Sequence, residues 1–180
     1  MIKNQTSHYG LISIFIHWLT VIIVLGLSVL GLWMVDLDYY SEWYKTGPEI
    51  HRSIGVLLAL LLMFRLVWRF LSPPPASIES HKVWEQISAR LVHWFLLLLM
   101  CAVIAAGYLI STADGRGIDV FGWFVVPATL TSIPDQEDLA GDIHFYLAMT
   151  LLAMAALHGL AALKHHFIDR DGTLVRMFGR

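Results

Sequence analysis

Long apolar runs dominate the chain and alternate with short polar segments. Four of these runs reach the roughly 20 residues that a helix needs to cross a hydrocarbon core of about 30 Å. They cover approximately residues 11–35, 53–71, 91–110 and 143–163. The pattern therefore predicts an all-α membrane protein, with a four-transmembrane-helix bundle forming a single domain over residues 1–180.

The composition strengthens this prediction. Of the 180 residues, 57% are hydrophobic and only 14% are charged, and the mean hydropathy is +0.66. Soluble domains carry about 25% charged residues, so these values exclude an ordinary soluble fold of this length.

Lysine and arginine are distributed unevenly among the connecting segments. The N-terminal segment, the loop over residues 72–90 and the C-terminal tail carry most of them, whereas the other two loops are acidic. Cytoplasmic loops of membrane proteins carry an excess of Lys and Arg. We therefore expect both termini to be cytoplasmic and both acidic loops to face outward. The apolar, aromatic segment within the outer loop 111–142 is expected to lie at the outer interface or to cap the bundle.

Two histidines interrupt the last apolar run, which reads IHFYLAMTLLAMAALHGLAALKHHF over residues 143–167. Lipid offers no partner for the donor and acceptor of a neutral imidazole, so such histidines are costly unless they bind something. His144 and His158 are fourteen residues apart. They therefore lie on nearly the same helix face, about 21 Å apart along the axis, with one imidazole in each leaflet.

Depth in the membrane suggests partners for both residues. His51, at the outer mouth of the second run, is level with His144, and His17 in the first run is level with His158. Two imidazole pairs at two depths, with no Cys or carboxylate at either, favour a b-type haem in each leaflet, because each haem iron takes two axial nitrogens. The predicted axial ligands are thus His17, His51, His144 and His158.

The histidines admit other interpretations. His93, in the third run at the inner depth, is an alternative ligand to His17; otherwise we expect it to contact a haem propionate or a quinone. The histidines could also be structural, bonded across helices. A transporter or sensor binding a metal ion directly would need three or four ligands at one depth, often with Cys or carboxylate among them. The paired pattern favours haem binding over a structural role and over direct binding of a metal ion.

Arginines and glycines add to the candidate site. Arg65 lies on nearly the same helix face as His51, at the inner depth, where a haem propionate would neutralise it. Arg52 is expected to serve the outer haem likewise, with snorkelling to the headgroups as the alternative. Gly55 and Gly159 would let the backbone approach a macrocycle closely.

The remaining histidines lie outside the apolar runs. His8 and His81 lie in polar flanks and are expected to be solvated. For His165 and His166, which follow the last run, interfacial solvation is the default, and contact with a haem propionate or a quinone head is the alternative.

Several motifs resemble the bacterial cytochrome b561 family. They are ISIFIHW, EIHRSIGVLLALLLMFRLVWRFLSPPP, LVHW and LHGLAALKHHFIDRDGTLVRM, and together they cover nearly the whole chain. The resemblance implies a four-helix bundle of the bacterial inner membrane with two b haems, transferring electrons in connection with quinone. The family's four axial histidines would fall on His17, His51, His144 and His158.

The expected function is electron transfer between a periplasmic redox partner and the quinone pool. The expected partners are the lipid bilayer, quinone and that redox protein. No nucleic-acid partner is expected. A superoxide oxidase that reduces ubiquinone and a haem-bearing anchor subunit of a dehydrogenase are the alternatives. The acidic outer loops disfavour an anionic substrate such as superoxide, although a local basic patch of Lys45, Arg52 and Arg116 could oppose them.

Overall fold

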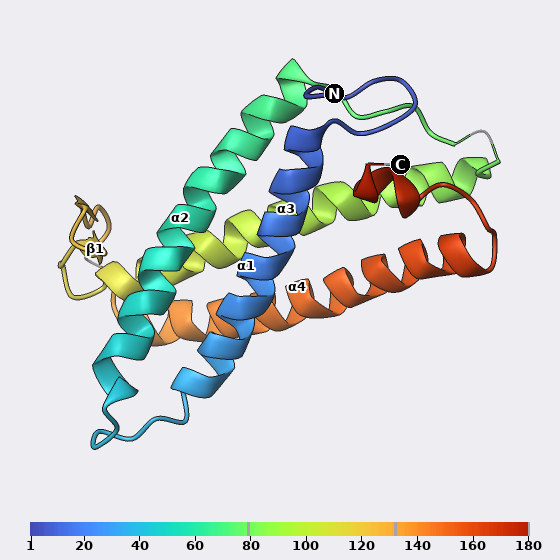
Figure 1. Cartoon of the computed structure of the whole chain (residues 1–180). Helices are drawn as coiled ribbons and strands as arrows, with labels where there is room; N and C mark the ends of the chain where they lie inside the picture. Colours follow the sequence, from blue (N-terminus) through green and yellow to red (C-terminus); the bar gives the residue numbers. More distant parts are fainter. Residues whose placement is uncertain (79, 132, 180) are drawn as a thin grey trace.

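The computed structural model describes residues 1–78, 80–131 and 133–179, and within them the chain forms four long helices and a small β-hairpin (Figure 1). All four helices are long and apolar enough to cross a membrane, which confirms the predicted fold class. A short 3-10 helix, η1, closes the C-terminal tail. The helices are α1 (Leu11–Met34), α2 (Trp43–Leu71), α3 (Val83–Thr112) and α4 (Gln136–Phe167), and η1 covers Val175–Phe178.

Three of the four helices, α2, α3 and α4, extend beyond the apolar runs from which they were predicted. The helix α2 begins at Trp43, although the apolar run begins only near residue 53, and it contains Pro48 in its second turn. Hydropathy marks only the part of a helix that lies in lipid, and the polar first turns of α2, α3 and α4 lie outside that part.

The helices associate as two pairs. The most extensive contacts join α3 to α4 and α1 to α2, whereas α4 makes few contacts with α1 or α2. In Figure 1 the α1–α2 pair crosses the α3–α4 pair obliquely. The buried core lies near the middle of the bundle and consists of Leu58, Leu62, Leu99, Met100 and Leu151. Leu151 lies midway between His144 and His158 in α4, so an apolar layer separates the two depths at which these histidines occur.

The two termini lie at the same end of the bundle, called here the termini end. Asn4 N donates to Ser72 Oγ at 2.9 Å, which ties the N-terminal segment to the α2–α3 connector. Trp18 Nε1 donates to Met177 O at 2.8 Å, which ties the tail to α1. The segments that are rich in Lys and Arg therefore meet at one end of the bundle.

A β-hairpin covers the opposite end, called here the hairpin end. The strand β1 (Ile118–Val120) pairs antiparallel with β2 (Phe124–Val126). The side chain of Val120 is fully buried, and Ser53 Oγ in α2 donates to Asp119 O at 3.2 Å. The outer loop therefore packs against the bundle, but the strands themselves were not predicted.

Candidate functional site

Two imidazoles from different helix pairs meet near the hairpin end. The ring centroids of His51 in α2 and His144 in α4 are 6.2 Å apart, with an angle of 72° between the ring planes. Nδ1 of His144 lies 2.9 Å from Val103 O. Because a carbonyl only accepts, this bond assigns the proton to Nδ1 and leaves the lone pair of Nε2 free for a ligand. We call His51 and His144 the hairpin-end level.

Glycines hold both rings of the hairpin-end level against neighbouring helices. A Cβ at Gly31 in α1 would lie 3.2 Å from Cε1 of His51, and a Cβ at Gly107 in α3 would lie 3.1 Å from Cε1 of His144. Both distances are shorter than an ordinary van der Waals contact, so a side chain at either position would displace the ring. A Cβ at Gly55, in contrast, would meet no atom within 4 Å.

The hairpin-end level fits a metal held between two imidazoles. An ion bound to one nitrogen of each ring at about 2 Å would place the ring centroids about 6 Å apart. Nδ1 of His51 is buried and has no hydrogen-bond partner within the described residues. A buried polar atom without a partner costs about 1–3 kcal/mol, so this nitrogen, which faces Gly31 of α1, still needs a hydrogen bond.

Three imidazoles and a guanidinium meet nearer the termini end. The ring centroids of His93 in α3 and His158 in α4 are 5.1 Å apart. His17 in α1 and Arg65 in α2 lie close enough to both for electrostatic interaction. We call His17, His93 and His158 the termini-end level. Depth along the sequence predicts that His158 pairs with His17. In the described chain, however, the ring of His158 contacts that of His93.

Arg65 at this level is half-buried and has no carboxylate partner among the described residues. A buried guanidinium needs an anion, which a haem propionate would supply. Tyr9 lies near Arg65, Arg69 and Arg176. Burial raises the pKa of Tyr9, while the three arginines oppose this shift.

A pocket of about 450 Å³ opens at the hairpin end, between the first turns of α2 and the β-hairpin. Arg52, which follows His51 in α2, lines it together with Arg116 and the carboxylates of Glu49, Asp114 and Asp119. Nη2 of Arg116 lies 2.5 Å from Oδ2 of Asp114, and the hydrogen bonds from Arg116 hold the pKa of Asp114 below its usual range. The pocket therefore carries three carboxylates against two guanidinium groups and is not a basic patch.

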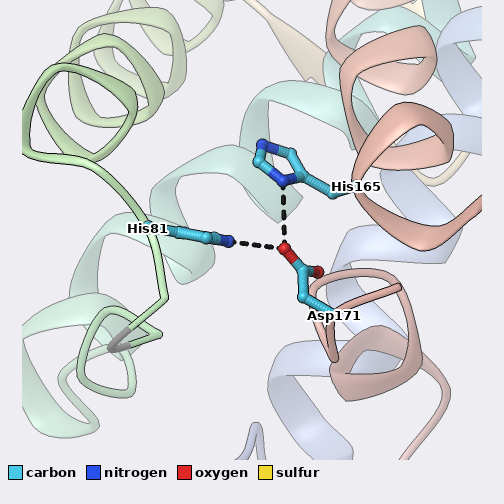
Figure 2. Close-up of side chains that lie close together, drawn as sticks. All are labelled: His81, His165 and Asp171. Atoms are coloured by element: carbon cyan, nitrogen blue, oxygen red, sulfur yellow. Dashed lines mark hydrogen bonds and ion pairs between the residues drawn. The ribbon is translucent and has the colours of Figure 1, made fainter. Parts of the chain in front are cut away.

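The expectation that His81 and His165 are solvated is wrong. Figure 2 shows both imidazoles directed at one carboxylate, that of Asp171. Nε2 of His81 lies 2.8 Å from Oδ2 of Asp171, and the three side chains are only 7% to 16% exposed. Burial alone would raise the pKa of Asp171, but hydrogen bonds from Thr173 and His81 and the charge of His165 lower it to about 2. No sequence pattern indicates this cluster, because Asp171 reaches it only when the tail folds back.

Comparisons with known proteins point to one family. Residues 8–180, which include all five histidines of the two levels, match the model of the family described as prokaryotic cytochrome b561. The chain is 51% identical over 177 residues to "Cytochrome b561 homolog 2" of Escherichia coli (strain K12), covering 98% of this chain and 94% of that protein. It is 30% identical over 170 residues to "Probable superoxide oxidase CybB" of Yersinia pestis, covering 94% of each chain. It is 25% identical over 177 residues to "Cytochrome b561 homolog 1" of Escherichia coli (strain K12), covering 97% of this chain and 98% of that protein.

Proposed function

Because the chain belongs to the prokaryotic cytochrome b561 family, and is therefore a haem b-binding electron-transfer protein of the bacterial inner membrane, we propose that it holds two b haems, one at each histidine level. The observation that carries this proposal is the His51–His144 pair. A second group of imidazoles lies around His158, which is about 21 Å further along α4 than His144. Bound haem supplies reversible one-electron chemistry, and the protein supplies its position and its electrostatic surroundings.

At the hairpin-end level, His51 and His144 are the proposed axial ligands. The bond between His144 Nδ1 and Val103 O holds the ring in one tautomer and one orientation, as second-shell partners of metal-binding histidines do. Gly31 and Gly107 allow the two rings to lie close to α1 and α3. The buried Nδ1 of His51 marks where a further hydrogen bond remains to be made.

At the termini-end level, His17 and His158 are the proposed ligands, and His93 is the alternative to His17. Ligands on opposite faces of a macrocycle must come from helices that are held apart. The helix α4 makes few contacts with α1 and with α2, so the pairs His17–His158 and His51–His144 both meet this condition. His93 lies on α3, which packs most extensively against α4, and this favours a contact of His93 with a haem propionate or a quinone.

The proposed path of electrons runs between a periplasmic redox partner at the hairpin end and the quinone pool. The excess of Lys and Arg at the termini end supports a cytoplasmic position for that end. Between the two levels lies the apolar layer around Leu151, and the two proposed ligands on α4 are about 21 Å apart along the helix axis. Arg65 is proposed to neutralise a propionate of the haem at the termini-end level, and Arg52 one at the hairpin-end level.

The pocket beside His51 bears on the identity of the outer partner. Its three carboxylates against two guanidinium groups favour a neutral or cationic electron donor over a free anion. A superoxide oxidase is the second candidate function, because a relative that is 30% identical bears the name of a probable superoxide oxidase. A haem-bearing anchor of a dehydrogenase is a third, and co-purification of a partner subunit would identify it.

Anaerobic rapid mixing of the oxidised protein with ubiquinol, followed through the b-type absorption bands, tests the proposed link to quinone. We expect reduction of the wild-type protein and a much slower reaction of His158→Ala. Absence of any reaction with ubiquinol or, for the reduced protein, with ubiquinone would contradict the proposal. Rapid reduction by superoxide, slowed by Arg52→Gln, would favour the superoxide oxidase instead.

A further inference from the structure

Three segments that are distant in sequence meet at the termini end. His81 comes from the α2–α3 connector, His165 from the last turn of α4, and Asp171 from the C-terminal tail (Figure 2). Nε2 of His81 lies 2.8 Å and Nδ1 of His165 lies 3.0 Å from Oδ2 of Asp171. The three donor atoms all lie within 4.8 Å of one another.

The spacing of these atoms is close to that of a coordination sphere. Ligand atoms bound at 2.0–2.1 Å in a tetrahedron are about 3.3 Å apart. The atoms of the cluster would therefore need to move apart by only a few tenths of an ångström to admit an ion. We propose that His81, His165 and Asp171 form a binding site for a divalent first-row transition-metal ion such as Zn²⁺.

The local structure orients these three atoms toward one another, although Oγ1 of Thr173 also lies 3.2 Å from Nε2 of His81 and would have to move aside for an ion. Thr173 N donates to Oδ1 of Asp171 at 2.8 Å, so Oδ2 is the atom that faces both imidazoles. Arg170 has φ of 53°, which turns the tail sharply, and Asp171 N donates to His165 O at 3.1 Å. Gln86 Nε2 donates to His81 O at 3.0 Å and so helps to hold the connector in place.

A fourth ligand is within reach. Oδ2 of Asp169 lies 2.8 Å from Nδ1 of His165, and Glu85 belongs to an overlapping group of ligand atoms with both residues. Lys164 pairs with Asp169 at 2.6 Å and with Glu85 at 3.5 Å. Imidazole and carboxylate oxygen are suitable ligands for Zn²⁺, and Asp169 or water would complete four-coordination.

The site is separate from the proposed haem levels. His165 follows His158 by seven residues, which places it about 10 Å further along α4. A bound ion would join the connector and the tail to the end of α4, because each of the three segments contributes one ligand. Without an ion, the same residues form a hydrogen-bonded cluster of two imidazoles around one carboxylate, so metal binding itself must be measured.

The test uses the purified full-length protein without a histidine tag. The chelator-treated protein is dialysed against ZnCl₂, bound zinc is measured by mass spectrometry, and affinity is measured by competition with a chromophoric chelator. We expect one Zn²⁺ per chain in the wild type. Asp171→Asn, which keeps the size of the side chain, and His81→Ala are each expected to weaken binding by at least about tenfold.

His166→Ala is the matched control, since it removes an imidazole from the next position of α4 but not from the cluster. All proteins are compared at equal b-type absorbance, which shows that each variant is folded. Zn²⁺ should also slow tryptic cleavage after Arg176 in the wild type and in His166→Ala, but not in Asp171→Asn. Failure of the wild type to retain zinc, or equal affinities of Asp171→Asn and His166→Ala, would overturn the proposal.

Discussion

The imidazole rings of His51 and His144 lie with their centroids 6.2 Å apart, although they belong to helices that make few other contacts. In a lipid environment, helices usually associate through close packing of small residues. Here the two helices approach through polar rings, one of which has a buried nitrogen without a partner in the described chain. This relationship supports the proposal that the two rings share a ligand.

Replacement of one ring tests the hairpin-end pair. His144→Ala is expected to lose one of the two haems, because one axial nitrogen and its support from Val103 are removed together. The haem-to-protein ratio from a pyridine haemochrome assay should therefore fall by half. His166→Ala, in the same helix, should keep the wild-type ratio. An unchanged ratio in His144→Ala would exclude this residue as an essential ligand.

A methyl group beside His51 tests how closely this ring is held. In Gly31→Ala the new Cβ would lie 3.2 Å from Cε1 of His51, so the ring must move, and we expect haem affinity at this level to fall by about tenfold or more. The control is Gly26→Ala in the same helix, where a Cβ would meet no atom within 4 Å. Haem titration of the two depleted variants measures the difference. Equal affinities would show that the position of His51 tolerates this displacement.

The choice between His17 and His93 is settled by comparing their alanine variants. If His17 is the ligand, His17→Ala should lose the haem of the termini-end level, whereas His93→Ala should keep it with a shifted redox potential. Low-temperature difference spectra and the haem-to-protein ratio report both effects. The reverse result would assign the ligand to α3 and would mean that α3 and α4 separate to admit the macrocycle.

Removal of the charge of Arg65 is expected to lower one redox potential. A nearby positive charge favours the reduced, less positive form of a redox centre, and at a half-buried site its loss costs on the order of 1 kcal/mol, or roughly 50 mV. A potentiometric titration of Arg65→Gln should therefore show one midpoint shifted downward and the other unchanged. Arg65→Lys, which keeps the positive charge, should leave this midpoint close to its wild-type value. Two unchanged midpoints would place Arg65 away from both centres.

The sequence predicted the helices well because length and hydropathy are sufficient to identify membrane-spanning segments. It also placed His51 and His144 at one depth, since helical rise converts sequence position into depth. The polar beginnings of α2, α3 and α4 were missed because hydropathy carries no signal there. The hairpin was missed because Phe121, a poor residue for positive φ, occupies its turn at φ of 53°.

Contacts that depend on how the chain folds back were beyond the sequence. His81 stands in a polar connector and resembles a solvated residue until the tail brings Asp171 to it. The neighbours of His158 posed a similar problem, because depth alone cannot distinguish α1 from α3. The structure shows that α3 packs against α4, whereas α1 makes few contacts with α4.

The most direct test of the central claim is a dithionite-reduced-minus-oxidised spectrum of the purified wild-type protein, recorded together with its haem-to-protein ratio. The account requires b-type bands and two haems per chain, with one lost in His144→Ala. A spectrum without b-type bands, or a ratio of one haem per chain in fully loaded protein, would contradict it.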